Sequence, residues 1–167
     1  MPEPTPIETL IGIFISSHQR EFQAIRNSLR DAIDGEDLFN KFIMKAELVE
    51  KKGGTTIKGD ISAAMERSAL YVGIFGNRFS ETVQSEYEEA KRRGLPALVF
   101  EIPPSKKETR DKRLKTLISR MKRVDDTRVM MIGAKRERLD IITRRIAAMV
   151  ADMVLQNKEI RATLNPQ

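Results

Sequence analysis

One glutamate between residues 83 and 94 lacks the basic partner that its neighbours have at helical spacing. Two neighbouring acids are each followed four residues later by an arginine, in the pairs Glu88–Arg92 and Glu89–Arg93. That spacing and order favour ion pairs on the exposed face of a helix. Glu86 is instead followed by Ala90, and it lies three residues after Val83, on or beside the apolar stripe. We therefore expect Glu86 to face the inside of the protein.

A carboxylate in that position has a chemical use if the helix starts beside a ligand. The positive end of the helix macrodipole stabilises an acid in the first turn, where we place Glu86. Such a carboxylate can act as a nucleophile or stabilise a developing positive charge. The alternative is that Glu86 is only a favourable helix-start acid, because Ser85 and Glu88 have the spacing of a capping box. The residues alone leave both interpretations open.

Further polar residues follow apolar runs that predict strands, so we expect them at the same edge of the protein. They are Ser16, Ser17 and His18 after the first run, and Gly76, Asn77 and Arg78 after the third. A glycine there lets the backbone approach a ligand, and Arg78 could hold a phosphate or carboxylate. The alternative is that the hydroxyls cap a helix and that Arg78 is solvated. His18 is the only histidine and there is no cysteine, so we predict no metal site.

The glycine-containing loops lack the spacing of the common nucleotide-binding signatures. Residues 51–56 do not match the P-loop, and residues 73–79 do not match the GxGxxG pattern. We therefore predict no bound cofactor.

The elements that must position these residues alternate between apolar runs and helical patterns. Five runs predict strands, at Leu10–Ser16, Phe42–Val49, Leu70–Phe75, Pro96–Ile102 and Arg128–Ile132. Helices are predicted over Gln19–Ile33, Asp60–Arg67, 83–94, Asp111–Arg123 and Glu137–Asn157. Strands separated by helices imply right-handed crossovers and a mainly parallel sheet. We predict a flavodoxin-like, three-layer, doubly wound α/β fold with five parallel strands in the order 2-1-3-4-5.

Length and composition bound the remaining expectations. The 167 residues suit one domain over 1–167, with its core at 8–157 and flexible termini, or a piece cut from a longer protein. The N-terminus is acidic and proline-rich rather than basic and then apolar, no apolar run is long enough to span a bilayer, and cysteine is absent. We therefore expect a soluble, cytoplasmic protein that does not enter a membrane.

The net charge of +6 is concentrated in one part of the chain. Residues 105–145 contain 15 Lys/Arg and 6 Asp/Glu, which leaves the rest slightly acidic. A local basic surface can attract nucleic acid. The alternative is a pair of solvated helices.

Three segments together resemble a known domain family. They are IGIFISSHQREFQAIRNSLRDAI, SALYVGIFGNRF and SEYEEAKRRGLPALVFEI, which run from about Leu10 to Ile102. They are similar to an uncharacterised family that begins with an x-I-F-I-S-S strand and often stands at the N-termini of signalling NTPases. That family resembles the nucleoside 2-deoxyribosyltransferases and the Toll/interleukin-1 receptor (TIR) domains, some of which cleave NAD. Both resemblances imply the same topology and a catalytic glutamate on the equivalent helix.

The resemblance to the transferases rests on one spacing pattern and has two departures. Glu86, Ala90, Gly94 and Pro96 reproduce a transferase pattern similar to E-x-x-x-A-x-x-x-G-x-P, whose glutamate is the nucleophile. The transferases usually carry an acid in or before the third strand, where this chain has Ser68–Ala69. Their glycine–threonine step before the glutamate is replaced by residues 82–85.

Three functions follow as hypotheses. The first is cleavage or transfer at the N-glycosidic bond of a nucleoside or nucleotide, with Glu86 as nucleophile or cation stabiliser. Ser16, Ser17, Gly76, Asn77 and Arg78 would bind the ligand, and Glu47 is a weaker second carboxylate. The second is a non-catalytic, TIR-like signalling module that self-associates, and a homo-oligomer is expected in either case. The third is nucleic-acid binding through residues 106–123, which lack aromatic side chains for base stacking.

Overall fold

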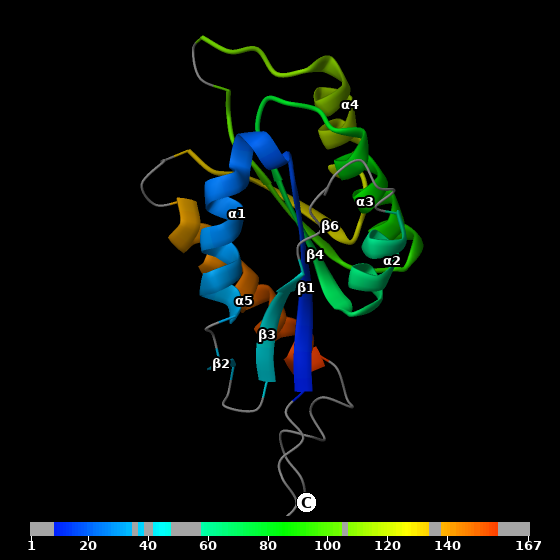
Figure 1. Ribbon diagram of the computed structural model, residues 1–167, viewed down its shortest axis with the longest axis vertical. Helices are drawn as coiled ribbons and strands as arrows, with labels where there is room; N and C mark the ends of the chain where they lie inside the picture. The colour runs from blue at the N-terminus through cyan, green and yellow to red at the C-terminus, as the bar shows by residue number, and fades with distance from the viewer. Residues whose placement is uncertain are drawn as a thin grey trace, which may run out of the picture.

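A six-stranded sheet forms the centre of the computed structural model (Figure 1). The structure describes residues 9–34, 37–38, 42–47, 58–104, 107–133 and 138–156. The strands are β1 (Thr9–Ser17), β2 (Asp37–Leu38), β3 (Phe42–Glu47), β4 (Ser68–Phe75), β5 (Ala97–Glu101) and β6 (Thr127–Met131). Their order across the sheet is β2-β3-β1-β4-β5-β6. β2 runs antiparallel to β3, and the other neighbouring strands are parallel.

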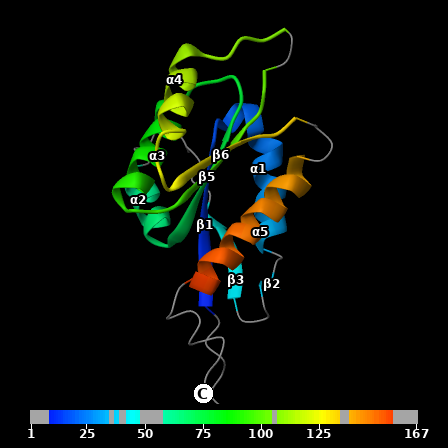
Figure 2. The same ribbon diagram turned by 180° about the vertical axis from the view of Figure 1, so that it is seen from behind.

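Helices cover both faces of this sheet. They are α1 (Gln19–Asp34), α2 (Lys58–Glu66), α3 (Glu81–Arg92), α4 (Lys112–Met121) and α5 (Arg138–Gln156). Figures 1 and 2 show α1 and α5 against one face, with α2, α3 and α4 against the other. Among the described residues, no helix is long and apolar enough to cross a membrane.

The residues of β4 show why this strand lies in the middle of the sheet. Leu70, Val72 and Ile74 are buried in the core that includes α1 and α5. Tyr71 and Phe75, which alternate with them, are buried in the second core, under α2, α3 and α4. Because successive side chains of a strand point to opposite faces, a run that is apolar throughout has to be covered on both sides.

The point between β1 and β4 is where the chain changes direction across the sheet. The chain passes from β1 to β3 on one side, and then crosses back to β4 on the other side of β1. Ser16, near the end of β1, is level with Gly73 of β4. In open α/β sheets, ligands bind at the carboxyl ends of the strands beside such a switch point.

The α/β prediction is confirmed, and three details of it need correction. The sheet has six strands rather than five, because Asp37–Leu38 adds an antiparallel edge strand too short to leave a sequence pattern. α3 begins at Glu81, so Glu86 lies in its second turn rather than its first. Ser85 and Glu88 are therefore inside the helix and form no capping box. The predicted flexible termini and the loop at residues 51–56 lie outside the described residues.

Candidate functional site

Helix α3 directs Glu86 into the protein. Ser80 is the N-cap, and its side chain accepts a hydrogen bond from the backbone N–H of Val83 (3.4 Å). From that start, Val83, Tyr87 and Ala90 form the buried stripe, and Glu86 is buried with them at 3% exposed. Thus Glu86 faces the sheet, as its lack of a basic partner at i+4 predicts.

Burial makes the Glu86 carboxyl group hard to ionise. Desolvation is the main reason that its pKa rises from 4.5 to about 8. The positive charge of Arg26 and the hydroxyl of Ser16 act in the opposite direction, but they do not overcome it. At pH 7 the carboxyl group is therefore mostly protonated in the absence of a ligand.

Three buried oxygen atoms, one of Glu86 and two of neighbouring side chains, lack hydrogen-bond partners. They are Ser16 Oγ, Tyr71 OH and Glu86 Oε2. Burial raises the pKa of both Tyr71 and Glu86, and the nearby Ser16 hydroxyl offsets only part of that rise, although no pair of the three groups meets hydrogen-bond geometry. We refer to Ser16, Tyr71 and Glu86 as the buried polar cluster. Leaving a buried polar group unpaired costs about 1–3 kcal/mol, so such atoms require an explanation.

Arg26 brings a positive charge to the same region from the opposite face of the sheet. Its side chain is only 2% exposed, and one guanidinium nitrogen donates to the Ser17 carbonyl (2.8 Å) and to Ser17 Oγ (3.2 Å). Ser17 is therefore a partner of Arg26 rather than of Glu86. Arg26 lies four residues after Phe22 and three before Leu29, so helical spacing alone would have placed it on the buried face of α1.

The loop after β4 forms a second group of predicted site residues. The carboxylate of Glu21, in the first turn of α1, accepts hydrogen bonds from the backbone N–H groups of Asn77 (2.7 Å) and Arg78 (3.0 Å). A Cβ atom on Gly76 would meet this carboxylate at 2.3 Å. The glycine thus allows a close approach to its backbone, but a side chain of the same protein makes that approach.

The side chains of this loop differ in their surroundings. Asn77 donates from Nδ2 to the carboxylate of Glu108, and the Arg78 side chain is exposed. A groove of about 510 Å³ lies here, lined by His18, Asn77, Arg78, Phe79, Glu108, Thr109 and Asp111. Glu86 does not line it. The predicted residues are therefore divided. Ser16 and Glu86 lie in the buried polar cluster, Ser17 contacts Arg26, and Gly76, Asn77 and Arg78 lie at this open groove, which we call the rim.

Arg110 holds the rim to the sheet. It is buried, and it donates to the carbonyl groups of Gly76 (2.7 Å) and Ile102 (2.7 Å). It also forms an ion pair with Glu101, whose other carboxylate oxygen lies 3.4 Å from Lys122. Because these contacts join the ends of β4 and β5, Arg110 fixes the shape of the loop that carries Asn77. The sequence showed it only as one residue of a basic segment.

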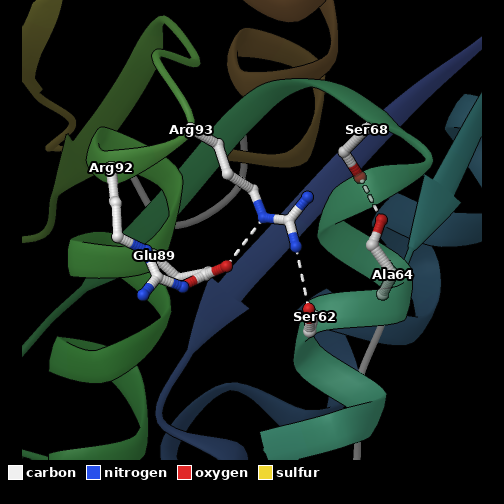
Figure 3. A network of polar contacts seen from close by, with 6 residues as sticks. All are labelled: Ser62, Ala64, Ser68, Glu89, Arg92 and Arg93. Atoms are coloured by element: carbon white, nitrogen blue, oxygen red, sulfur yellow. Dashed lines mark hydrogen bonds and ion pairs between the residues drawn. The ribbon is translucent and has the colours of Figure 1, made fainter.

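A second groove lies between α2 and α3, and it is distinct from the rim. It has a volume of about 450 Å³ and is lined by Ile61, Ser62, Ser85, Glu88, Glu89 and Arg92. Figure 3 shows the Arg93 guanidinium between the two helices, where it donates to Glu89 (2.7 Å) and to Ser62 (2.8 Å).

These contacts test the two ion pairs predicted for α3. The predicted Glu89–Arg93 pair is confirmed. The predicted Glu88–Arg92 pair is wrong, because Arg92 also bonds to Glu89 and Glu88 lies 3.7 Å from Arg120 of α4.

Two remaining predictions concern carboxylates and metal ions. Glu47 is the last residue of β3 and is level with Phe14 of β1, but its side chain lies outside the described residues. Among the residues that are described, no three His, Cys, Asp or Glu side chains are placed to hold a metal ion.

Comparisons with known proteins identify a family and a fold. The model of the family described as Domain of unknown function (DUF4062) matches residues 12–145. No curated protein matches the sequence. Among solved structures, the chain is similar to the apo form of translation elongation factor SelB from Methanococcus maripaludis, with 15% identity and a TM-score of 0.54. The similarity covers 84% of this chain and 33% of the elongation factor, so this chain spans about a third of the length of the elongation factor.

Proposed function

This chain belongs to the DUF4062 family, and we propose that it cleaves or transfers the N-glycosidic bond of a nucleoside-like ligand at Glu86. The observation that carries the proposal is the buried polar cluster at the β1–β4 switch point. Three buried oxygen atoms without partners, one of them on a carboxyl group with a pKa of about 8, are costly to keep in a core. Binding a polar ligand would explain that cost. The spacing pattern shared with the deoxyribosyltransferases supports the same residue.

The proposed reaction assigns the Glu86 carboxylate a single role. It attacks the anomeric carbon, or stabilises the positive charge that develops there, while the electron pair of the glycosidic bond leaves with the base. Water or a second base then takes the sugar and releases the carboxylate. Since positive charge nearby lowers the pKa of a carboxyl group, a ligand that carries or develops such charge favours ionised Glu86. Proton release on ligand binding is therefore part of the proposal.

The other residues would support this chemistry. The hydroxyl groups of Ser16 and Tyr71 would interact with the sugar or with Glu86, and their burial beside that carboxyl group supports this role. The positive charge of Arg26 would lower the pKa of Glu86 and so favour its ionised form. Glu47 would be a weaker second carboxylate for the reaction. On the rim, the side chains of Asn77 and Arg78 would contact the outer part of the ligand.

The test is turnover by the purified protein with NAD and with a panel of deoxynucleosides. We expect wild-type activity on at least one of them, and loss of at least about a hundredfold in Glu86→Gln, which removes the only proposed nucleophile. Glu88→Gln is the matched control, because it removes an exposed acid from the same helix. No turnover by the wild type at any protein concentration would refute the proposal.

One observation favours a second candidate, a non-catalytic interaction module. Glu86 is only 3% exposed and lines neither of the grooves described above. If its burial is purely structural, the domain would act by self-association. Concentration-dependent assembly that is unchanged in Glu86→Gln, without turnover by the wild type, would support this function.

The described part of the basic segment offers less support for nucleic-acid binding. Arg113 is paired with Asp111, and Arg120 lies beside Glu88. These acids neutralise part of the charge that would otherwise attract phosphate groups.

A further inference from the structure

Two adjacent backbone N–H groups at the β4–α3 loop form an arrangement that is suited to an anion. The N–H groups of Asn77 and Arg78 both point to the carboxylate of Glu21, which accepts one bond with each of its oxygen atoms. Successive N–H groups that converge in this way commonly bind phosphate in other proteins. Here the anion is a side chain of the protein itself. Glu21 lies 56 residues before Asn77 and 57 residues before Arg78 in the sequence.

Contacts with His18 and Gly76 hold Glu21 in that position. Its own backbone N–H donates to His18 Nδ1 (3.3 Å), which ties it to the start of α1. Its carboxylate lies against Gly76, where an added Cβ would approach Oε1 to 2.3 Å and Cδ to 3.0 Å. The neighbouring Phe22 ring is also close, at 2.7 Å from the same Cβ position. The bond from Asn77 to Glu21 is therefore part-buried, whereas the bond from Arg78 is exposed.

The groove beside Glu21 is lined by two acids and by Arg78, and one of the acids, Asp111, is paired with Arg113. Glu108 accepts a hydrogen bond from the Asn77 side chain, and both Glu108 and Asp111 line the groove beside it. A phosphate group approaching the loop would find the two backbone donors occupied by Glu21 and would also meet the carboxylate of Glu108. Repulsion between these carboxylates and the phosphate group opposes such an approach.

We infer that Glu21 is a specificity-determining residue, which occupies the anion position of the β4–α3 loop and excludes ligands that would place a phosphate group there. The exclusion of phosphorylated ligands rests on the proposed function, because it assumes that a nucleoside-like ligand binds here. It then predicts that the site takes an unphosphorylated nucleoside in preference to the corresponding 5′-monophosphate. The occupied anion position itself does not depend on that function.

The first experiment uses inorganic phosphate as the probe, so it needs no catalytic activity. Phosphate is titrated into ¹⁵N-labelled protein, and the backbone amide signals of Asn77 and Arg78 are followed. In the wild type we expect no saturable shift of these two signals. In Glu21→Ala we expect saturable shifts of both, with an affinity at least about tenfold higher than any binding by the wild type.

Two further variants separate the anion position from general charge and from misfolding. Glu108→Ala removes one negative charge from the rim but leaves Glu21 on the backbone donors, so it should not create phosphate binding at Asn77 and Arg78. Gly76→Ala keeps every charge but displaces the Glu21 carboxylate, so it should create that binding. If the alanine variant does not fold, Glu21→Gln replaces it; its amide oxygen can still accept one of the two N–H bonds, so we expect weaker but saturable phosphate shifts. Equal phosphate shifts in the wild type and the Glu21 variants, or none in either, would overturn the inference.

The second experiment tests the ligand class. Binding of a nucleoside and of its 5′-monophosphate is compared in the Glu86→Gln background, where turnover does not interfere. We expect the nucleoside to bind at least about tenfold more tightly, and the difference to shrink when Glu21→Ala is added. Tighter binding of the monophosphate to the protein with Glu21 intact would refute the exclusion of phosphate. Absence of nucleoside turnover by the wild type, with the phosphate result as expected, would refute the proposed function and leave the anion position in place.

Discussion

Replacing Glu86 by glutamine is expected to make the folded protein more stable at neutral pH, and increasingly so as the pH rises. The carboxyl group has a pKa of about 8 in the folded protein and 4.5 as its ordinary value. Between these two values the unfolded chain holds Glu86 ionised while the folded protein keeps it protonated. The unfolded state therefore binds fewer protons, and the stability of the wild type falls as the pH increases through this range.

The size of the effect follows from the two pKa values. One pKa unit corresponds to about 1.4 kcal/mol, so Glu86 lowers the free energy of unfolding by roughly 3 kcal/mol at pH 7 and roughly 5 kcal/mol above pH 8. Below pH 4.5 the carboxyl group is protonated in both states, and this cost disappears. Glutamine has nearly the same shape and no charge, so Glu86→Gln removes the pH-dependent part of the cost and should leave the fold unchanged.

The assay is urea unfolding of the wild type and Glu86→Gln at pH 5, 7 and 8.5, with Glu88→Gln as the control. The difference between the wild type and Glu86→Gln should grow with pH by roughly 1 kcal/mol per pH unit between 5 and 8. The exposed Glu88 should give a small difference that does not follow this trend. A difference for Glu86→Gln that is independent of pH, or a variant less stable than the wild type at pH 8.5, would refute the reasoning.

Two further variants test the contacts that shape the site. Arg110→Met leaves the carboxylate of Glu101 buried without its main partner, and we expect a loss of about 3–5 kcal/mol in the free energy of unfolding, measured by urea unfolding; a loss below about 1 kcal/mol would show that Arg110 does not hold the rim. Tyr87→Phe removes the 2.8 Å hydrogen bond to the buried Thr127 hydroxyl, which should cost about 1–2 kcal/mol by thermal unfolding; an unchanged melting temperature would contradict this.

The alternation of strands and helices was predictable because it depends on local pattern. Runs such as Leu70–Phe75 are apolar on both faces, and only a strand covered on both sides can bury all of them. The order of elements along the chain then leaves few compatible α/β topologies. The edge strand β2 was not predictable in this way, because two residues are too few to show a periodicity, although their partner β3 follows closely in the sequence.

The direction of Glu86 also came from local spacing, since the side chain that lacks an i+4 partner lies between apolar positions. The surroundings of Glu86 could not be read from local spacing. Tyr71 and Arg26 come from β4 and α1, and only the packing of those elements places them beside the same carboxyl group. Ser16 also depends on packing. The strand pattern places it at the carboxyl end of β1 but does not show which helix covers it. The raised pKa is therefore a property of the tertiary structure.

The sequence by itself determined an α/β protein with an inward-facing acid on its third helix, because both are consequences of periodicity along the chain. Only the tertiary structure decided that the residues expected in one site are divided between a buried polar cluster and an open rim. It also decided that Glu21, rather than a ligand, bonds to the backbone of Asn77 and Arg78. That contact joins residues more than fifty positions apart, and folding brings them together through the adjacent ends of β1 and β4.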